Sequence, residues 1–238
     1  MNLSDIFSDA VRYPFSNIVN YLFVGVLALL ASLPNIIKAF NMDSSAVSAV
    51  AAILAVFFSI VLSGYCVTVI KKGIENSDEI PEINVFGNLI DGIKVFIISI
   101  VYYIIPLVVV LIFAVMTGAI GAGLGVLVAA LGVFLIVAIL LFILFGIFEV
   151  VAIARFAKTG ELSDALNIGA VIEDAKRIGI INIIAFILIS IVIVAVAYIV
   201  GTIICLVPFI GAILSSLIVG GFVVLFYNKA LGLLYSQY

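Results

Sequence analysis

The 238-residue sequence is 67% hydrophobic and 10% charged, with a mean hydropathy of +1.52. Soluble domains are about half apolar and about a quarter charged, so this composition excludes a water-soluble monomer. The net charge is −3, and no block of Lys or Arg is long enough to suggest a nucleic-acid partner. We therefore expect an integral membrane protein whose first partners are membrane lipids.

Six apolar runs, each nearly free of ionisable groups, follow one another along the chain. About 20 apolar residues suffice for a helix to cross the hydrocarbon core. The runs are apolar on every face, whereas the strands of a membrane barrel alternate apolar and polar residues. We predict an all-α integral membrane bundle of six transmembrane helices at residues 18–37, 46–70, 95–116, 124–151, 178–199 and 209–227.

The basic residues indicate the orientation of these spans. Nine of the ten fall in segments on the N-terminal side of the predicted membrane, and Lys38 is the exception. Lys and Arg in short loops favour the cytoplasm, so both termini are expected there, with the protein in the cell membrane. The nine are Arg12, Lys71, Lys72, Lys94, Arg155, Lys158, Lys176, Arg177 and Lys229.

A four-residue pattern recurs in the charged segments. Its first residue is an acid, its second is small, and its fourth is a base. Its starting positions are 9, 91 and 174, so the intervals are 82 and 83 residues (91 − 9 and 174 − 91). Regular intervals are typical of internal repeats. We predict a single membrane domain, residues 1–238, of three pseudo-repeats at about 1–75, 76–160 and 161–238, each an amphipathic interfacial helix followed by a transmembrane hairpin.

Two interpretations of this pattern stay open. The acid and base can form a simple ion pair on a surface helix, worth a few tenths of a kcal/mol. Alternatively, the small residues Ala10, Gly92 and Ala175 let each interfacial helix pack closely on a span. In either case the bases are candidates for contacts with anionic lipid headgroups, each worth about 1 kcal/mol: Arg12, Lys94 and Arg177.

A further set of residues carries a family resemblance over roughly residues 60–106. In chain order these are Gly64-Tyr65, Lys71, Lys72, Gly73, Pro81, Asp91-Gly92-Ile93-Lys94, Tyr102-Tyr103 and Pro106. This order resembles the uncharacterised archaeal and bacterial multi-pass membrane family catalogued as domain of unknown function 4013. The resemblance implies an integral membrane protein and brings no activity with it.

Residues that could carry chemistry are scarce. The sequence has no histidine, which removes the commonest general base and the commonest metal ligand, so we expect no enzyme activity, metal or cofactor. Glu149 is the acid nearest a span interior, and an intramembrane ionisable group is a candidate functional site. One interpretation has Glu149 reach the interface or pair with a base, and the other has it line a polar cavity or ion pathway.

Two functions remain at this point. The first is a non-catalytic scaffold, assembly factor, accessory subunit or lipid-interacting protein, possible partners being another membrane protein or a cytoplasmic protein. Charge concentrated on one face, with little inside the membrane, favours it. The alternative is a transporter or channel for a small or lipid-like solute, favoured by parallel repeats and by Glu149.

Overall fold

The computed structural model describes residues 2–42, 44–119, 124–207 and 210–238, and for residues 114, 116–119, 124–131 and 133 it describes the backbone alone. Within these ranges the secondary structure is helical and contains no strand, which confirms the all-α prediction. The elements are α1 (Leu3–Arg12), η1 (Tyr13–Phe15), α2 (Ile18–Ala31), α3 (Leu33–Ala39), α4 (Ser45–Ile74), α5 (Val85–Ala119), α6 (Leu124–Thr159), α7 (Leu162–Leu166), α8 (Ile168–Ile178), α9 (Ile180–Ile204), α10 (Gly211–Ser215), η2 (Ser216–Gly220) and α11 (Gly221–Ser236).

Five stretches in the described residues are long and apolar enough to cross a membrane: Ser45–Ile74, Val85–Phe113, Phe134–Thr159, Ile180–Ile204 and Gly211–Ser236. These confirm the last five predicted spans in number and place. The first predicted span differs, because helix α2 has only 14 residues and α3 begins after a break at Ser32. A sixth crossing exists if the pair Leu3–Phe15 and Ile18–Ala31, bent by 90°, counts as one span.

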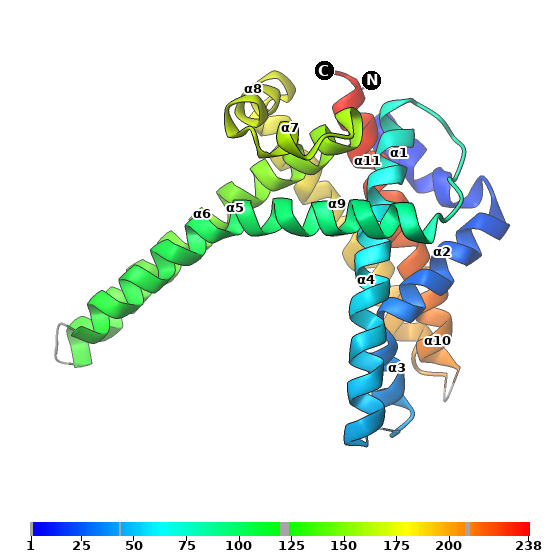
Figure 1. Ribbon diagram of the computed structural model, residues 1–238, viewed down its shortest axis with the longest axis horizontal. Helices are drawn as coiled ribbons and strands as arrows, with labels where there is room; N and C mark the ends of the chain where they lie inside the picture. The colour runs from blue at the N-terminus through cyan, green and yellow to red at the C-terminus, as the bar shows by residue number, and fades with distance from the viewer. Residues whose placement is uncertain (1, 43, 120–123, 208–209) are drawn as a thin grey trace.

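The helices form a bundle with one hairpin standing apart from it (Figure 1). Helices α2, α3, α4, α9, α10 and α11 make the bundle, while α5 and α6 lead away together as a long hairpin. The stretch Gly211–Ser236 is the centre of the bundle. In its most apolar 18-residue segment 61% of the residues are buried, against 11–22% in the corresponding segments of the other four stretches. The remaining spans therefore expose most of their apolar surface.

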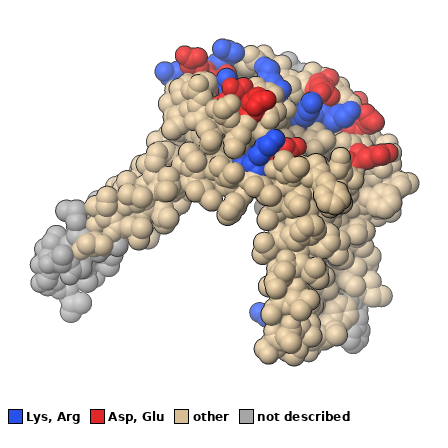
Figure 2. Space-filling view, viewed as in Figure 1, with Lys and Arg blue, Asp and Glu red and all other residues tan. Residues whose placement is uncertain are grey.

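Charged side chains gather at one end of the molecule, above both the bundle and the hairpin (Figure 2). The two chain termini lie at this same end, and α3, which carries Lys38, lies at the opposite end of the bundle (Figure 1). Charge segregated in this way leaves a long apolar zone below it, as a bilayer requires. We call this charged region the charged end.

Most buried side chains lie in two clusters near the charged end. The larger has members on α1, α4, α5, α6, α7, α8, α9 and α11, and the ring of Phe7 in α1 stacks on Phe186 in α9 at 5.6 Å between centroids. The smaller surrounds Tyr65 of α4 and includes Ile80 from the loop between α4 and α5. The charged end therefore contains most of the buried side chains, and the hairpin and the lower part of the bundle contain fewer.

The three segments with the repeated pattern have different structures. Two are separate helices, α1 and α8, whereas the second forms the opening turns of α5 and runs into the span without a break. Helix α1 places its apolar residues Ile6 and Phe7 against the protein core. The repeat organisation is not confirmed, and it stays a prediction.

Candidate functional site

The loop between α4 and α5 is held by an unusual set of hydrogen bonds. Helix α4 is followed by a left-handed residue, Asn76 (φ 53°), and residues 77–84 then run without regular secondary structure. Five successive backbone carbonyls in this loop each accept a hydrogen bond from a side chain of another element: Ser77 from Lys229 Nζ (2.6 Å), Asp78 from Ser16 Oγ (3.1 Å), Glu79 from Tyr13 Oη (2.8 Å), Ile80 from Asn20 Nδ2 (2.9 Å) and Pro81 from Tyr65 Oη (3.0 Å). We call these contacts the 77–81 clamp.

The clamp includes a buried cation. Lys229 of α11 is 1% exposed, and its ammonium group lies 3.3 Å from Asp78 Oδ1 and 4.8 Å from the ring centroid of Tyr13. A buried ammonium group needs partners for its charge and for its N–H donors. The carbonyl of Ser77, the carboxylate and the aromatic face supply them, so Lys229 fixes the loop on the central helix.

Two glycines bring α4 and α5 into backbone contact directly below the clamp. A Cβ atom at Gly64 would overlap the carbonyl oxygen of Asn88, and one at Gly92 would overlap the carbonyl oxygen of Ile60. Only glycine permits this approach. Gly92, predicted from sequence as a packing joint, thus touches a span, and that span is α4, which precedes it in the chain.

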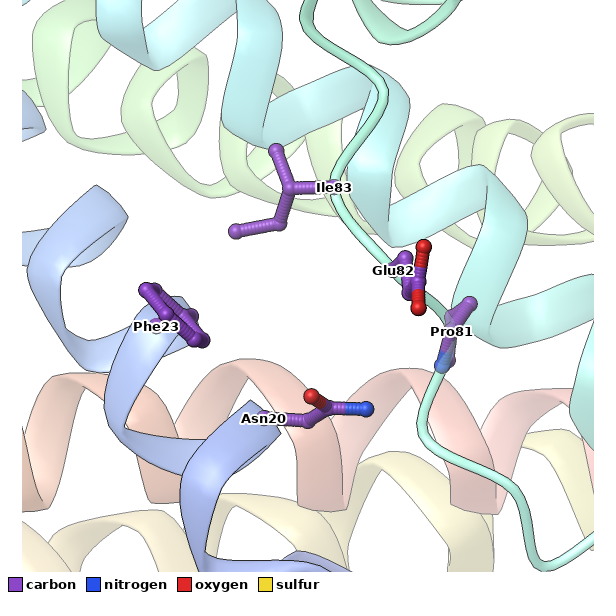
Figure 3. Close-up of a pocket in the computed structure, with 5 residues that line it drawn as sticks. All are labelled: Asn20, Phe23, Pro81, Glu82 and Ile83. Atoms are coloured by element: carbon purple, nitrogen blue, oxygen red, sulfur yellow. The ribbon is translucent and has the colours of Figure 1, made fainter.

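A pocket of about 260 Å³ opens between α2 and the clamped loop. Figure 3 shows Asn20 and Phe23 of α2 on one side, with Pro81, Glu82 and Ile83 of the loop on the other. Glu82 is exposed and Pro81 is buried, so the pocket is a shallow opening at the edge of the clamp. Its lining offers one carboxylate and one amide, which together specify no reaction.

A second polar centre lies on α8. The Asp174 carboxylate receives hydrogen bonds from Arg155 Nη1 of α6 (2.7 Å) and from Tyr235 Oη of α11 (2.5 Å), while Arg177 Nη1 lies 3.9 Å away. Burial alone would raise the pKa of Asp174, but the hydrogen bonds from Tyr235 and Arg155 outweigh it and hold the pKa below its usual value. Asp174 therefore joins three helices as a charged, structural tie.

The predicted headgroup residues have different surroundings. Arg12 lies at the end of α1 and is exposed. Lys94 Nζ lies 3.2 Å from Asp91 Oδ1 and 5.3 Å from the ring centroid of Phe156, so its charge already has partners. Contact of Arg12, Lys94 and Arg177 with lipid stays a prediction. The other two predicted joints, Ala10 and Ala175, are 0% and 1% exposed.

Glu149 lies where α5 and α6 meet. The Ser99 hydroxyl of α5 donates a 2.5 Å hydrogen bond to Glu149 Oε1. The phenol of Tyr103 also interacts with this carboxyl group, and the phenol of Tyr227 lies near enough to feel its charge. The nearest base in sequence, Arg155, pairs with Asp174. Both interpretations of Glu149 stay predictions. The structure adds that hydroxyl groups, those of Ser99 and Tyr103, surround its carboxyl group.

The far end of the bundle contains irregular backbone. Residues Ser216–Gly220 form a π-helix inside the last span, and the Tyr21 hydroxyl donates a 2.5 Å hydrogen bond to the carbonyl of Ile218 there. The Ser32 and Ser216 hydroxyls, at the α2 break and at the π-helix start, are 3.3 Å apart. A cavity of about 320 Å³ beside them is lined by polar side chains, Asn35 among them, and by aliphatic ones such as Leu62 and Val223. π-helices often occur at functional sites.

The family described as a protein of unknown function (DUF4013) matches residues 47–206, more than half of the chain. The chain belongs to this family. No curated protein and no solved structure matches the chain. Among the described residues, no group of three or more His, Cys, Asp or Glu side chains lies close enough together to hold a metal ion.

The matched region runs from α4 to the beginning of the loop after α9, so the α4–α5 crossing and the 77–81 loop lie within this DUF4013 region. Several residues that carried the family resemblance meet there. Gly64 and Gly92 form the crossing, and Tyr65 binds the Pro81 carbonyl. These three positions have structural roles in this chain.

Sequence reasoning missed three parts of these sites. The donors Tyr13 and Asn20 carry no local signal, because they lie 66 and 60 residues from the carbonyls they bind. For Tyr235 the sequence suggests only a place in an aromatic belt, although this residue binds Asp174. A buried lysine inside an apolar run was the available signal for Lys229, since such a residue needs a partner.

Proposed function

We propose that this protein is a non-catalytic membrane scaffold or accessory subunit that holds a membrane partner through the α5–α6 hairpin. The observation that carries the proposal is the separation of this hairpin from the bundle (Figures 1 and 2). The charged end of the protein is held together by the 77–81 clamp and by the contacts of Asp174. A rigid base with a projecting apolar arm suits assembly better than chemistry.

The surface of the hairpin supports this assignment. Its two helices contact each other through the stacked rings of Phe113 and Phe134, whose centroids are 4.4 Å apart. Only 11% of the residues in the most apolar segment of Phe134–Thr159 are buried. Side chains such as Leu111 (55% exposed) and Leu140 (61% exposed) therefore face lipid or another chain. Two helices cannot enclose a pore, so the hairpin is better suited to lateral contact than to conduction.

A transporter for a small or lipid-like solute is the second candidate. The π-helix, the break at Ser32 and the cavity of about 320 Å³, whose lining includes Asn35, favour it, because transporters place irregular backbone beside water-filled or substrate-filled space. Glu149 supplies one ionisable group between helices. This candidate predicts a flux, whereas the scaffold predicts none.

Site-specific photo-crosslinking in native membranes tests the scaffold. A photoreactive residue at Leu140 on the hairpin is expected to give a discrete protein adduct, whereas one at Ile53 on the exposed face of α4 (70% exposed) is expected to give lipid adducts. Equal lipid labelling at both positions would contradict the proposal. Purified protein in liposomes provides the complementary measurement: a solute flux that Glu149→Gln abolishes in a folded protein would favour the transporter.

A further inference from the structure

A cavity of about 380 Å³ lies between α9 and α11. Its walls are apolar side chains of both helices: Ile187, Ile191, Val194, Val223 and Val224. Its polar lining residues are Ser190 of α9 together with Tyr227 and Asn228 of α11. The volume falls within the range of about 300–1,000 Å³ that is typical of small-molecule pockets.

Ser190 is the unusual member of this lining. It is 2% exposed, and its hydroxyl has no hydrogen-bond partner among the described residues. Serines and threonines in membrane helices commonly bond the carbonyl one turn earlier, as Thr202 does with Tyr198 (2.9 Å). A buried hydroxyl without a partner costs about 1–3 kcal/mol. An occupant that supplies a hydrogen bond would remove this cost.

Water is a poor occupant of this space. An ordered water needs two to four polar partners, whereas most of these walls are aliphatic. The Asn228 amide nitrogen already donates a 2.7 Å hydrogen bond to the carbonyl of Val224. A molecule with a mainly apolar body and one polar atom matches the lining better, since its body covers the aliphatic walls and its polar atom meets Ser190.

The lining also indicates charge and route of entry. Among the described residues that line the cavity, none is Asp, Glu, Lys or Arg, so these walls offer no counter-charge to an ionised headgroup. Ile191 at its rim is 58% exposed on the apolar surface. On the other side, Phe186 packs against Tyr227 with ring centroids 5.8 Å apart. The ligand would therefore enter sideways from the bilayer and stop at this aromatic pair.

We propose that the cavity between α9 and α11 binds a neutral, lipid-like molecule whose hydroxyl or carbonyl group hydrogen-bonds to Ser190. This inference goes beyond the scaffold assignment, because it concerns the space between α9 and α11 and does not use the exposed surface of the hairpin. Either can fail without the other.

The test uses the full-length protein in phosphatidylcholine vesicles with a photoreactive, clickable diacylglycerol as the probe. Ser190→Ala is expected to lower labelling about fivefold, the equivalent of one hydrogen bond, and Ser190→Thr is expected to retain it. Val194→Phe fills the cavity and should reduce labelling to background. Leu188→Phe is the matched control, because Leu188 is 57% exposed on the same helix and does not line the cavity.

Unchanged labelling of Ser190→Ala would overturn the proposal, as would equal loss in Leu188→Phe and Val194→Phe. Competition by phosphatidylserine as strong as competition by unlabelled diacylglycerol would overturn the neutral-ligand assignment. Mapping the adduct to α9 or α11 by mass spectrometry, with α4 and α6 unlabelled, would support it. Unfolding temperatures measured beside each labelling experiment separate loss of the site from loss of the fold.

Discussion

The Tyr65 hydroxyl donates a 3.0 Å hydrogen bond to the Pro81 carbonyl oxygen, which ties α4 to the loop entering α5. Tyr65 is fully buried, so no water can replace it as a donor. The Tyr65→Phe variant is expected to lose about 1–3 kcal/mol of unfolding free energy, because the carbonyl is left unpaired. Thermal unfolding in nanodiscs measures the loss. The matched control is Tyr198→Phe at a 60% exposed position, and equal effects of the two changes would contradict the prediction.

The α4–α5 crossing predicts a strong effect of adding one methyl group. Gly92→Ala places a Cβ on the carbonyl oxygen of Ile60, so the helices must separate and the variant should lose its monodisperse folded state. Gly132→Ala is the control, since in the described part of the chain no other element comes within 4 Å of a Cβ there and alanine is the better helix former. Size-exclusion profiles of the two purified variants provide the comparison. A well-folded Gly92→Ala protein would show that the close contact is dispensable.

Asp174 predicts an acid dependence of stability. Its folded-state pKa lies below the ordinary value of 3.8, so its contribution is present above that value and is lost as the pH falls through the lowered pKa. Asp174→Asn should cost about 2 kcal/mol at pH 7 and should flatten the loss of stability below about pH 4. Denaturation monitored across this pH range checks both effects. Glu173→Gln, an exposed neighbour on the same helix, should change neither.

The two lysines that bind the α4–α5 loop should differ in importance. Lys229 is buried and holds the Ser77 carbonyl, whereas Lys72 pairs with the exposed Glu79 carboxylate at 2.8 Å. Lys229→Met should raise backbone hydrogen exchange in residues 77–81 by about tenfold or more, because the loop loses its link to α11. Lys72→Met should leave exchange nearly unchanged, since exposed ion pairs contribute little. The reverse order would contradict the clamp.

The orientation inferred from the basic residues can be tested with single labels. A cysteine at Met42, beyond α3, should react with an impermeant reagent from outside the cell. A reporter fused after Tyr238 should be active only in the cytoplasm, because α3 and the C-terminus lie at opposite ends of the bundle. Accessibility of both sites from one side would defeat the proposed topology.

The sequence was sufficient for the helical class and for most spans, because 20-residue apolar runs have few alternatives in a membrane. It missed the break at Ser32, which lies inside the apolar run predicted as the first span, residues 18–37. It also suggested a separate helix before residue 95. Since no strong breaker lies between Val85 and Val95 and isolated glycines are tolerated, the helix simply continues.

The polar contacts were harder to predict because their partners are distant in sequence. The pattern correctly marked Asp174 and Arg177 as neighbours, yet Arg155 from another helix binds the same carboxylate more closely, at 2.7 Å against 3.9 Å. Local spacing identifies groups that can pair within one helix. It contains no information on which side chain of another helix contacts a given residue. The 77–81 clamp consists almost entirely of such contacts between elements distant in sequence.

The continuity of α5 has a mechanical consequence. Gly92 lies 7 residues from the start of the helix at Val85 and 27 from its end at Ala119, about 10 Å and about 40 Å at 1.5 Å per residue. The glycine contact therefore divides α5 into a short inner arm and a long outer arm, and we infer that it serves as the pivot between them. A swing of the outer arm moves the inner arm about one quarter as far, directly beside the clamped loop. Thinning or thickening of the surrounding bilayer, which tilts such helices, would then act as torque on that loop.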